Sequence, residues 1–163
     1  MGQVPLLEFD DGTYLAESVA ICRYFEEAQP SPPLFGTTAR GRAEVEMWSR
    51  RIELGLFAPV LAVWKHTDSN WAGRIPQVAA LADMERTRAQ ESLAILDEAL
   101  AQREFLACDR FSMADILALC TIEFAAEAAN IWTDPQLKHL AGWHEVVARR
   151  PSARACCLSA PHN

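Results

Sequence analysis

The sequence predicts a mainly α-helical protein, in which a short β-β-α piece precedes a bundle of α-helices. Three features support this fold class. Apolar residues flank a turn signal near the N-terminus, a proline-rich stretch ends the first helix, and the remaining chain repeats apolar residues at helical spacing. The 163 residues are enough for one domain together with part of another.

The first 28 residues contain the β-β-α piece. Residues 4–9 (VPLLEF) predict a strand, residues 10–12 (DDG) a hairpin turn and residues 13–15 (TYL) a return strand. Ser18 then precedes apolar residues at helical spacing. We interpret residues 29–38 as a linker, because their prolines cannot continue the helix.

The first helix after the linker is expected from about Ala39 to His66, since its apolar residues recur close to every 3.6 positions. Gly55 and Pro59 lie four residues apart inside it, so the ring of Pro59 meets the carbonyl group of Gly55. We therefore predict a kink at this point.

Three more helices complete the predicted all-α domain of residues 39–163. The first, from about Pro76 to Gln102, has an apolar stripe for the core and charged residues for water. The stripe is Ala89, Leu93, Leu96 and Leu100, and the charged residues are Glu85, Arg86, Arg88 and Glu91. The next, from about Met113 to Ala129, is apolar nearly all round, as is typical of the middle of a bundle. The last runs from about Pro135 to Arg150 and is stopped by Pro151.

Composition excludes several classes of function. A formal net charge of -7 gives no basic surface for nucleic acid or for an anionic membrane. The chain has neither a signal peptide nor an apolar run long enough to span a bilayer, so a cytoplasmic location is expected. No metal spacing is found, since His139 and His144 fall on different faces of a helix. The cysteines are interpreted as reduced; Cys22 and Cys120 lie in apolar helical patterns and Cys156-Cys157 in the tail.

Two short segments could carry chemistry, and each allows two interpretations. The Val4-Pro5 bond is either an ordinary trans bond at a strand start or a cis bond that turns the backbone of Val4 toward an added peptide strand. Ser18 either caps its own helix or binds a carboxylate together with the helix N-terminus. In the second case the neighbouring Glu17 could hold an ammonium, so the pair would fit an α-amino-acid group.

The two segments together resemble the second half of the thioredoxin-like domain of glutathione S-transferases. The resemblance rests on Gly2-Gln-Val-Pro-Leu-Leu-Glu, Asp11-Gly12, Leu15-Ala-Glu-Ser-Val-Ala-Ile and Arg23-Tyr24-Phe25. It implies that Val4, before a cis Pro5, pairs with the cysteinyl backbone of glutathione. It also implies that Glu17 and Ser18 hold the γ-glutamyl end, and that Gln3 reaches the glycyl side. Residues 1–28 would then be a partial glutathione-binding domain.

The helical part is similar to the same family, most of all to its bacterial cytosolic members. The segment from Phe105 to Asp115 resembles the capping motif ahead of the family's buried central helix, with Ser112 and Asp115 spaced as a structural N-capping box. Cys108 stands where relatives usually have glycine, so a left-handed backbone there would be strained. Trp143-His144 and Arg150-Pro151-Ser152 resemble the closing segment, so the resemblance covers almost the whole chain.

The resemblance also implies a β-α-β unit ahead of the Val-Pro strand, with the catalytic Tyr, Ser or Cys in it. We expect that residue upstream of Met1, because Tyr14 and Tyr24 do not match its position. The chain alone is therefore expected to be weak or inactive. A two-stranded hairpin alone is marginal, and family members commonly form homodimers through the two helices of residues 18–27 and 39–66. An unsatisfied surface is predicted there.

In its complete form the protein is expected to conjugate glutathione, as a co-substrate and without a cofactor, to hydrophobic electrophiles. Met47, Trp48 and Arg51 are candidates for the acceptor pocket, although core or dimer roles suit them better. The alternative function is a non-enzymatic module of the same family that binds protein partners. A third reading is an isolated all-α domain with a vestigial N-terminal piece.

Overall fold

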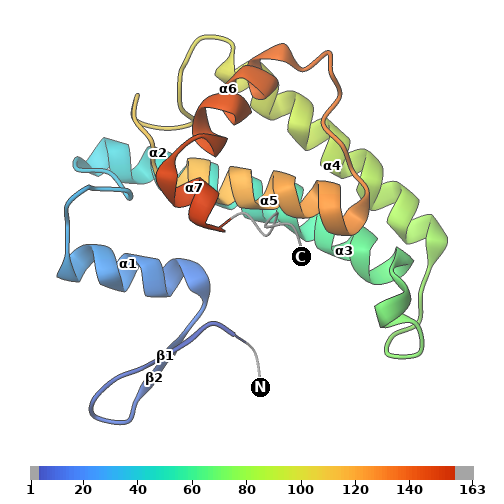
Figure 1. Ribbon diagram of the computed structural model, residues 1–163, viewed down its shortest axis with the longest axis horizontal. Helices are drawn as coiled ribbons and strands as arrows, with labels where there is room; N and C mark the ends of the chain where they lie inside the picture. The colour runs from blue at the N-terminus through green and yellow to red at the C-terminus, as the bar shows by residue number, and fades with distance from the viewer. Residues whose placement is uncertain (1–3, 157–163) are drawn as a thin grey trace.

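The computed structural model of the protein describes residues 4–156. Its strands are β1 (Leu6–Glu8) and β2 (Tyr14–Ala16), and its α-helices are α1 (Ser18–Ala28), α2 (Ala39–Ile52), α3 (Ala58–Thr67), α4 (Ala79–Leu100), α5 (Met113–Ala129), α6 (Lys138–Ala148) and α7 (Pro151–Cys156). A π-helix, η1 (Glu53–Phe57), joins α2 to α3, and a 3₁₀ turn, η2 (Ser69–Trp71), follows α3. The predicted fold class is confirmed. Figure 1 shows the hairpin and α1 projecting from one side of a helical bundle.

The hairpin forms where the turn residues predict it. The two strands are antiparallel, with Leu7 opposite Leu15. At the turn, Gly12 has a φ of 81°, and the Asp11 side chain accepts a hydrogen bond from the Thr13 amide at 2.9 Å. The Phe9 ring meets the Tyr24 ring of α1 edge-on, with centroids 5.0 Å apart. The hairpin and α1 therefore form one packed unit.

The irregularity predicted at Gly55 and Pro59 takes the form of η1. Instead of a single helix, α2 and α3 are separated by five residues of π-helix. Pro59 has no N–H to donate, and the carbonyl of Gly55 instead accepts a hydrogen bond from the Ser92 hydroxyl of α4 at 2.5 Å. A side chain from the neighbouring helix thus satisfies the exposed carbonyl.

The core lies around α5, which runs through the middle of the bundle and contacts α2, α3 and α6 (Figure 1). The predicted apolar stripe of α4, Ala89 to Leu100, is buried in the same core, where α4 packs on α3 and α6. The expectation that Glu85 faces water was wrong. Its side chain is buried where α4 packs on the bundle, and its carboxylate is paired with Arg88 one turn away, with 2.9 Å between nitrogen and oxygen.

Cys22 and Cys120 lie on exposed surfaces of α1 and α5, because neither helix is covered on every side. Pro151 does follow the end of α6, but it also begins α7, where the first helical position tolerates proline. Cys157 and Gln3 lie outside the described residues. Across residues 4–156, no helix is long and apolar enough to cross a membrane.

Candidate functional site

The register of the hairpin brings the two candidate segments to the same end. Leu6 pairs with Ala16 as the last pair of the ladder, so Val4-Pro5, just before β1, and Glu17-Ser18, just after β2, leave the hairpin at the same end. Adjacent strands lie about 4.8 Å apart, which a peptide backbone can bridge. The Val4-Pro5 bond is cis, the second of the two interpretations, and Val4 is 89% exposed.

Glu17 holds an unusual backbone conformation at this end of the hairpin. Its φ of 72° and ψ of 115° lie in a region that residues other than glycine rarely adopt. Such a conformation costs about 1–3 kcal/mol and is concentrated at functional sites. Its carbonyl still accepts the first helical bond of α1, from the Ile21 amide at 3.0 Å. Glu17, and not Ser18, is therefore the N-cap residue of α1.

The start of α1 is open to a ligand. Ser18 is exposed as the first helical residue. Within the described chain, this helix start has neither a capping side chain nor an acidic residue in its first turn. Free amides and the positive end of the helix dipole favour an anion there. With the Glu17 carboxylate beside them, they offer complementary charges to a carboxylate and an ammonium on one carbon.

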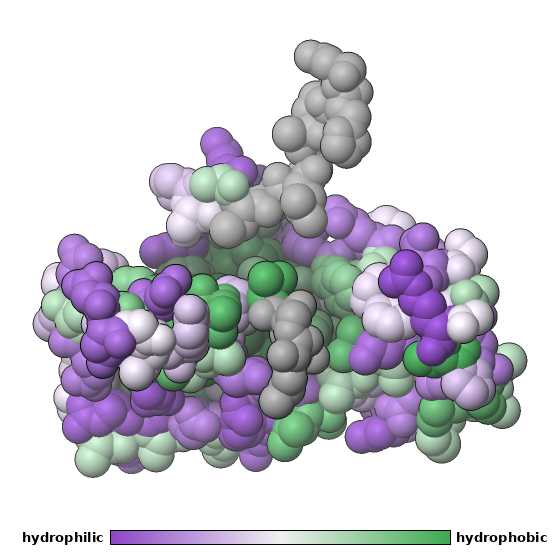
Figure 2. Space-filling model, turned by 90° about the horizontal axis from the view of Figure 1, so that it is seen from below, coloured by the Kyte–Doolittle hydropathy of each residue, from purple (hydrophilic) through white to green (hydrophobic). Residues whose placement is uncertain are grey.

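The face of the molecule on the hairpin side is hollowed. Figure 2 views it from that side and shows hydrophobic residues in a recess between the projecting hairpin and the rest of the bundle. The α1 helix contributes to this incompletely covered surface. None of its residues is buried in the described structure, and Tyr24 and Phe25 are 43% and 52% exposed. The unsatisfied surface predicted along this helix is therefore present.

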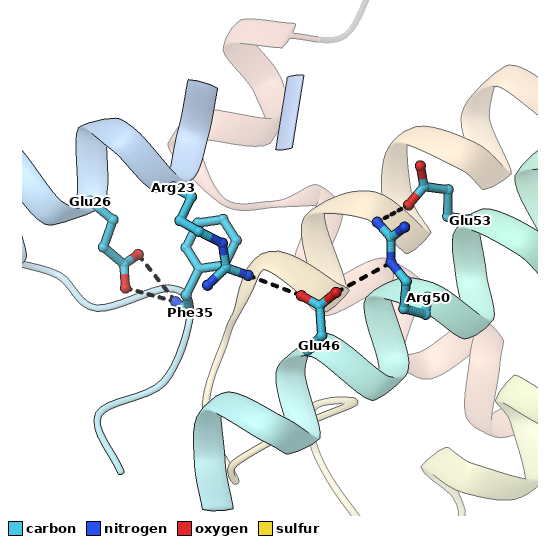
Figure 3. Close-up of polar contacts among 6 residues, drawn as sticks. All are labelled: Arg23, Glu26, Phe35, Glu46, Arg50 and Glu53. Carbon is cyan, nitrogen blue, oxygen red and sulfur yellow. Dashed lines mark hydrogen bonds and ion pairs between the residues drawn. The ribbon is translucent and has the colours of Figure 1, made fainter. Parts of the chain in front are cut away.

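Two of the three acceptor-pocket candidates line a groove, but it lies elsewhere. Trp48 and Arg51 border a groove of about 610 Å³ between α2 and α4, with the Arg51 guanidinium 4.9 Å from the Trp48 ring centre. Met47 is 40% exposed and is not among the lining residues. Glu46 marks the side of α2 that faces α1, where Arg23 binds it (Figure 3). Around the helix axis, Trp48 lies about 200° from Glu46 and Arg51 about 140° from it. Arg50, which pairs with Glu46, also lines the groove, but neither Glu17 nor Ser18 is among its lining residues.

The capping box stands at the start of α5. The Asp115 carboxylate accepts hydrogen bonds from the amide and the hydroxyl of Ser112 at 2.9 and 3.0 Å. Its second oxygen binds the Leu106 amide and the Trp143 indole N–H, each at 3.0 Å. Burial raises the pKa of Asp115, although these hydrogen bonds act in the opposite direction. The hydrogen bond from Trp143 to Asp115 could not be predicted from the sequence, because it links residues far apart in the chain.

Cys108 is left-handed, as its position in the motif suggested, with a φ of 60°. Its thiol donates to the carbonyl of Gly41 at 3.2 Å. Burial, and then the nearby Glu44 carboxylate, raise the pKa of this thiol, so it is held as a neutral thiol and not as a nucleophile. No group of His, Cys, Asp or Glu among the described residues could hold a metal ion.

Comparison with known families agrees with this fold. The family profile described as "Glutathione S-transferase, C-terminal domain" matches residues 57–151, and the corresponding N-terminal domain profile matches residues 1–28. The chain therefore belongs to the glutathione S-transferase family.

Individual relatives show how much of such a protein the chain spans. It is 32% identical over 158 residues to glutathione S-transferase 2 of Saccharomyces cerevisiae, covering 94% of this chain and 66% of the yeast protein. It is 30% identical over 126 residues to elongation factor 1-gamma of Prunus avium, covering 76% of this chain and 28% of that protein. The crystal structure of a class Gtt2 glutathione S-transferase of Vibrio parahaemolyticus superposes with a TM-score of 0.84 at 37% identity, over 94% of this chain and 72% of that one.

Proposed function

We propose that the complete protein transfers glutathione to electrophilic small molecules, and that the unit of hairpin and α1 in this chain holds the glutathione. The backbone of Val4 pairs with the cysteinyl residue, while Ser18 and the start of α1 bind the γ-glutamyl carboxylate and Glu17 its ammonium. Gln3 is assigned to the glycyl side. The observation that carries this proposal is the strained Glu17 beside an open helix start, at the end of the hairpin where the Val4-Pro5 segment enters β1.

This proposal assigns binding to the chain and leaves activation of the thiol aside. The nucleophile of such a transfer is the thiolate, so some group must lower the thiol pKa. Neither tyrosine is placed for that task. The hydroxyl of Tyr14 donates to Glu8 at 3.2 Å, and the Tyr24 ring packs on Phe9.

For the groove beside Trp48 and Arg51, a second copy of the chain is a better occupant than an electrophile. The residues that line the groove include none of the glutathione segments, and two of them, Leu54 and Ile95, are 63% and 55% exposed. A homodimer would cover these apolar side chains. The hydrophobic electrophile is placed in the recess of Figure 2 instead.

Calorimetric titration of glutathione into the chain tests the binding proposal. A hydrogen bond to a charged group contributes about 1.5–3 kcal/mol, so Ser18→Ala should weaken binding roughly 10- to 100-fold. Glu17→Gln should weaken it as well. Ser69→Ala changes an exposed serine at the far end of α3 and should leave the affinity unaltered. Cysteinylglycine, which lacks the γ-glutamyl group, should not compete; equal affinity for both peptides would refute the assignment.

The second candidate is a family module that binds a protein and performs no catalysis. The likeness to elongation factor 1-gamma favours it, together with the exposed apolar side chains of α1 and η1. A chain that takes up no glutathione, yet forms a stoichiometric complex with one purified partner through α1, would support this function over the first.

A further inference from the structure

One face of α1 turns toward the bundle. It carries Val19, Arg23 and Glu26, which are spaced four and three residues apart and therefore lie in line on the helix. Val19 packs against the core, and the two charged residues contact the linker and α2. Figure 3 shows both charged side chains reaching from α1 toward the bundle.

Glu26 makes the closest of these contacts. Its carboxylate accepts hydrogen bonds from two successive linker amides. The Leu34 amide lies at 2.7 Å, and the Phe35 amide lies 2.9 and 3.1 Å from the two oxygens (Figure 3). Bonds from two adjacent N–H groups to one carboxylate fix both its distance and its direction. They are also partly buried, so water competes for them less than at an open surface.

The linker residues that Glu26 binds are themselves fixed to the bundle. Phe35 is 5% exposed and belongs to the hydrophobic core. The carbonyl of Leu34 accepts a hydrogen bond from the amide of Met113, the first residue of α5, at 2.9 Å. The Glu26 carboxylate thus joins α1 to a segment that is held by the central helix.

The second charged contact is weaker. Arg23 stacks its guanidinium 4.5 Å from the centre of the Phe35 ring and binds Glu46 at 2.9 Å. Both partners of this ion pair remain about half exposed, at 45% and 47%, and exposed pairs contribute little. The orientation of α1 therefore depends mainly on Glu26.

We propose that Glu26 is a positioning residue that sets the angle between α1 and the helical bundle. This inference rests on the function proposed above, because the unit that Glu26 orients contains the proposed glutathione-binding residues Val4, Glu17 and Ser18. Loss of Glu26 leaves this binding unit intact but frees it to turn relative to the bundle. Binding of glutathione and its presentation to an acceptor on the bundle are then separable, and Glu26 governs the second.

The variant Glu26→Gln tests this inference, because it replaces one acceptor oxygen with an amide group that cannot accept. Glu27→Gln, one residue along α1 on an exposed side chain, is the matched control. Residual dipolar couplings measured by NMR should show α1 and α5 sharing one alignment in the wild-type and Glu27→Gln chains. In Glu26→Gln the couplings of α1 should no longer fit that alignment.

Two further readouts separate positioning from folding. Amide exchange at Leu34 and Phe35 should quicken about tenfold or more in Glu26→Gln, since their acceptor is impaired. The dissociation constant for glutathione, measured by calorimetry, should stay within about twofold of wild type. If Glu26→Gln does not fold, Glu26→Asp, which keeps both oxygens but shortens their reach, carries the same test.

An α1 that keeps its alignment in the variant would overturn the inference, and so would a glutathione affinity that falls along with the alignment. Failure of the proposed function looks different. In that case the wild-type chain does not bind glutathione, while the dipolar couplings and the amide exchange still decide whether Glu26 positions α1.

Discussion

The indole of Trp143 on α6 donates its N–H to the buried carboxylate of Asp115 at the start of α5, at 3.0 Å. The same oxygen accepts the amide of Leu106. One carboxylate therefore joins two helices and the loop before α5, in addition to capping its own helix.

This hydrogen bond predicts that replacing tryptophan by phenylalanine lowers stability far more at Trp143 than at Trp132. Trp143→Phe removes a buried hydrogen bond to a charged group and should lower the free energy of unfolding by about 2–3 kcal/mol. Trp132→Phe removes an indole bond to Asn130 that lies on the surface, where Trp132 is 67% exposed, and should change stability by less than about 0.5 kcal/mol. Urea unfolding of both variants checks this; similar losses would contradict a special role for the Asp115 contact.

A second prediction concerns pH. Burial raises the pKa of Asp115 above its ordinary value of 3.8, and this effect exceeds that of the hydrogen bonds that lower it. The folded protein then binds the proton more tightly than the unfolded chain does. The contribution of Asp115 to the free energy of unfolding is therefore greatest below the unfolded-state pKa and declines as pH rises through the folded-state value.

The variant Asp115→Asn isolates this contribution, because asparagine does not titrate. It should be less stable than wild type, by about 3–5 kcal/mol, since buried donors lose their acceptor. The difference between the two proteins should shrink as pH rises from about 3 to about 7. Urea unfolding across that range measures it, and a difference that grows with pH would show that the hydrogen bonds outweigh burial.

The strain at Glu17 predicts a conflict between stability and binding. Glycine adopts a φ of 72° without a steric penalty, so Glu17→Gly should stabilise the local unit by about 0.5–1 kcal/mol. The same change removes the carboxylate assigned to the ammonium of glutathione and should weaken its binding. Amide exchange in α1 reports the stability, and calorimetry reports the affinity.

Glu27→Gly is the control for this pair of effects. Glu27 lies within α1, where glycine costs about 0.5–1 kcal/mol of helix stability. It should therefore destabilise α1 and leave glutathione affinity unchanged. If Glu17→Gly gains stability without losing affinity, Glu17 does not contact the ligand.

Local patterns in the sequence account for most of the fold. The Asp-Gly turn predicts the hairpin, and Ser112 with its partner Asp115 predicts where α5 begins. Contacts between distant residues could not be predicted in this way. Burial of Glu85 depends on how α4 packs, and the Trp143–Asp115 bond spans 28 residues. The hydrogen bonds from the linker to Glu26 have no sequence signal, because their donors are backbone amides, which every residue except proline carries.

The position of the candidate segments in the fold also follows from local patterns. Once the turn is located, the hairpin brings the residues before β1 and those after β2 to the same end. The groove was not predictable, since helical spacing alone does not say which side of α2 faces α1. Only the contact between Arg23 and Glu46 fixes that, and it sets Trp48 and Arg51 on another side.

The last prediction concerns the linker. Gly36 has a φ of 89°, and a Cβ there would lie 2.7 Å from the Arg42 amide nitrogen and from the Gly41 carbonyl carbon. Gly73 has a similar φ of 79°, but a Cβ there would meet nothing within 4 Å. Alanine at either position pays the left-handed backbone penalty of about 1 kcal/mol. At Gly36 the clash with the start of α2 should add about 1–3 kcal/mol.

Urea unfolding should therefore show Gly36→Ala to be clearly less stable than Gly73→Ala. The clash can be relieved only by moving the linker away from α2, which also shifts Leu34 and Phe35, the residues that Glu26 binds. Amide exchange at these two residues should quicken in Gly36→Ala and stay unchanged in Gly73→Ala. If both variants lose the same stability, the turn at Gly36 has room to adapt, and the linker does not hold α1 as rigidly as its contacts with Glu26 indicate.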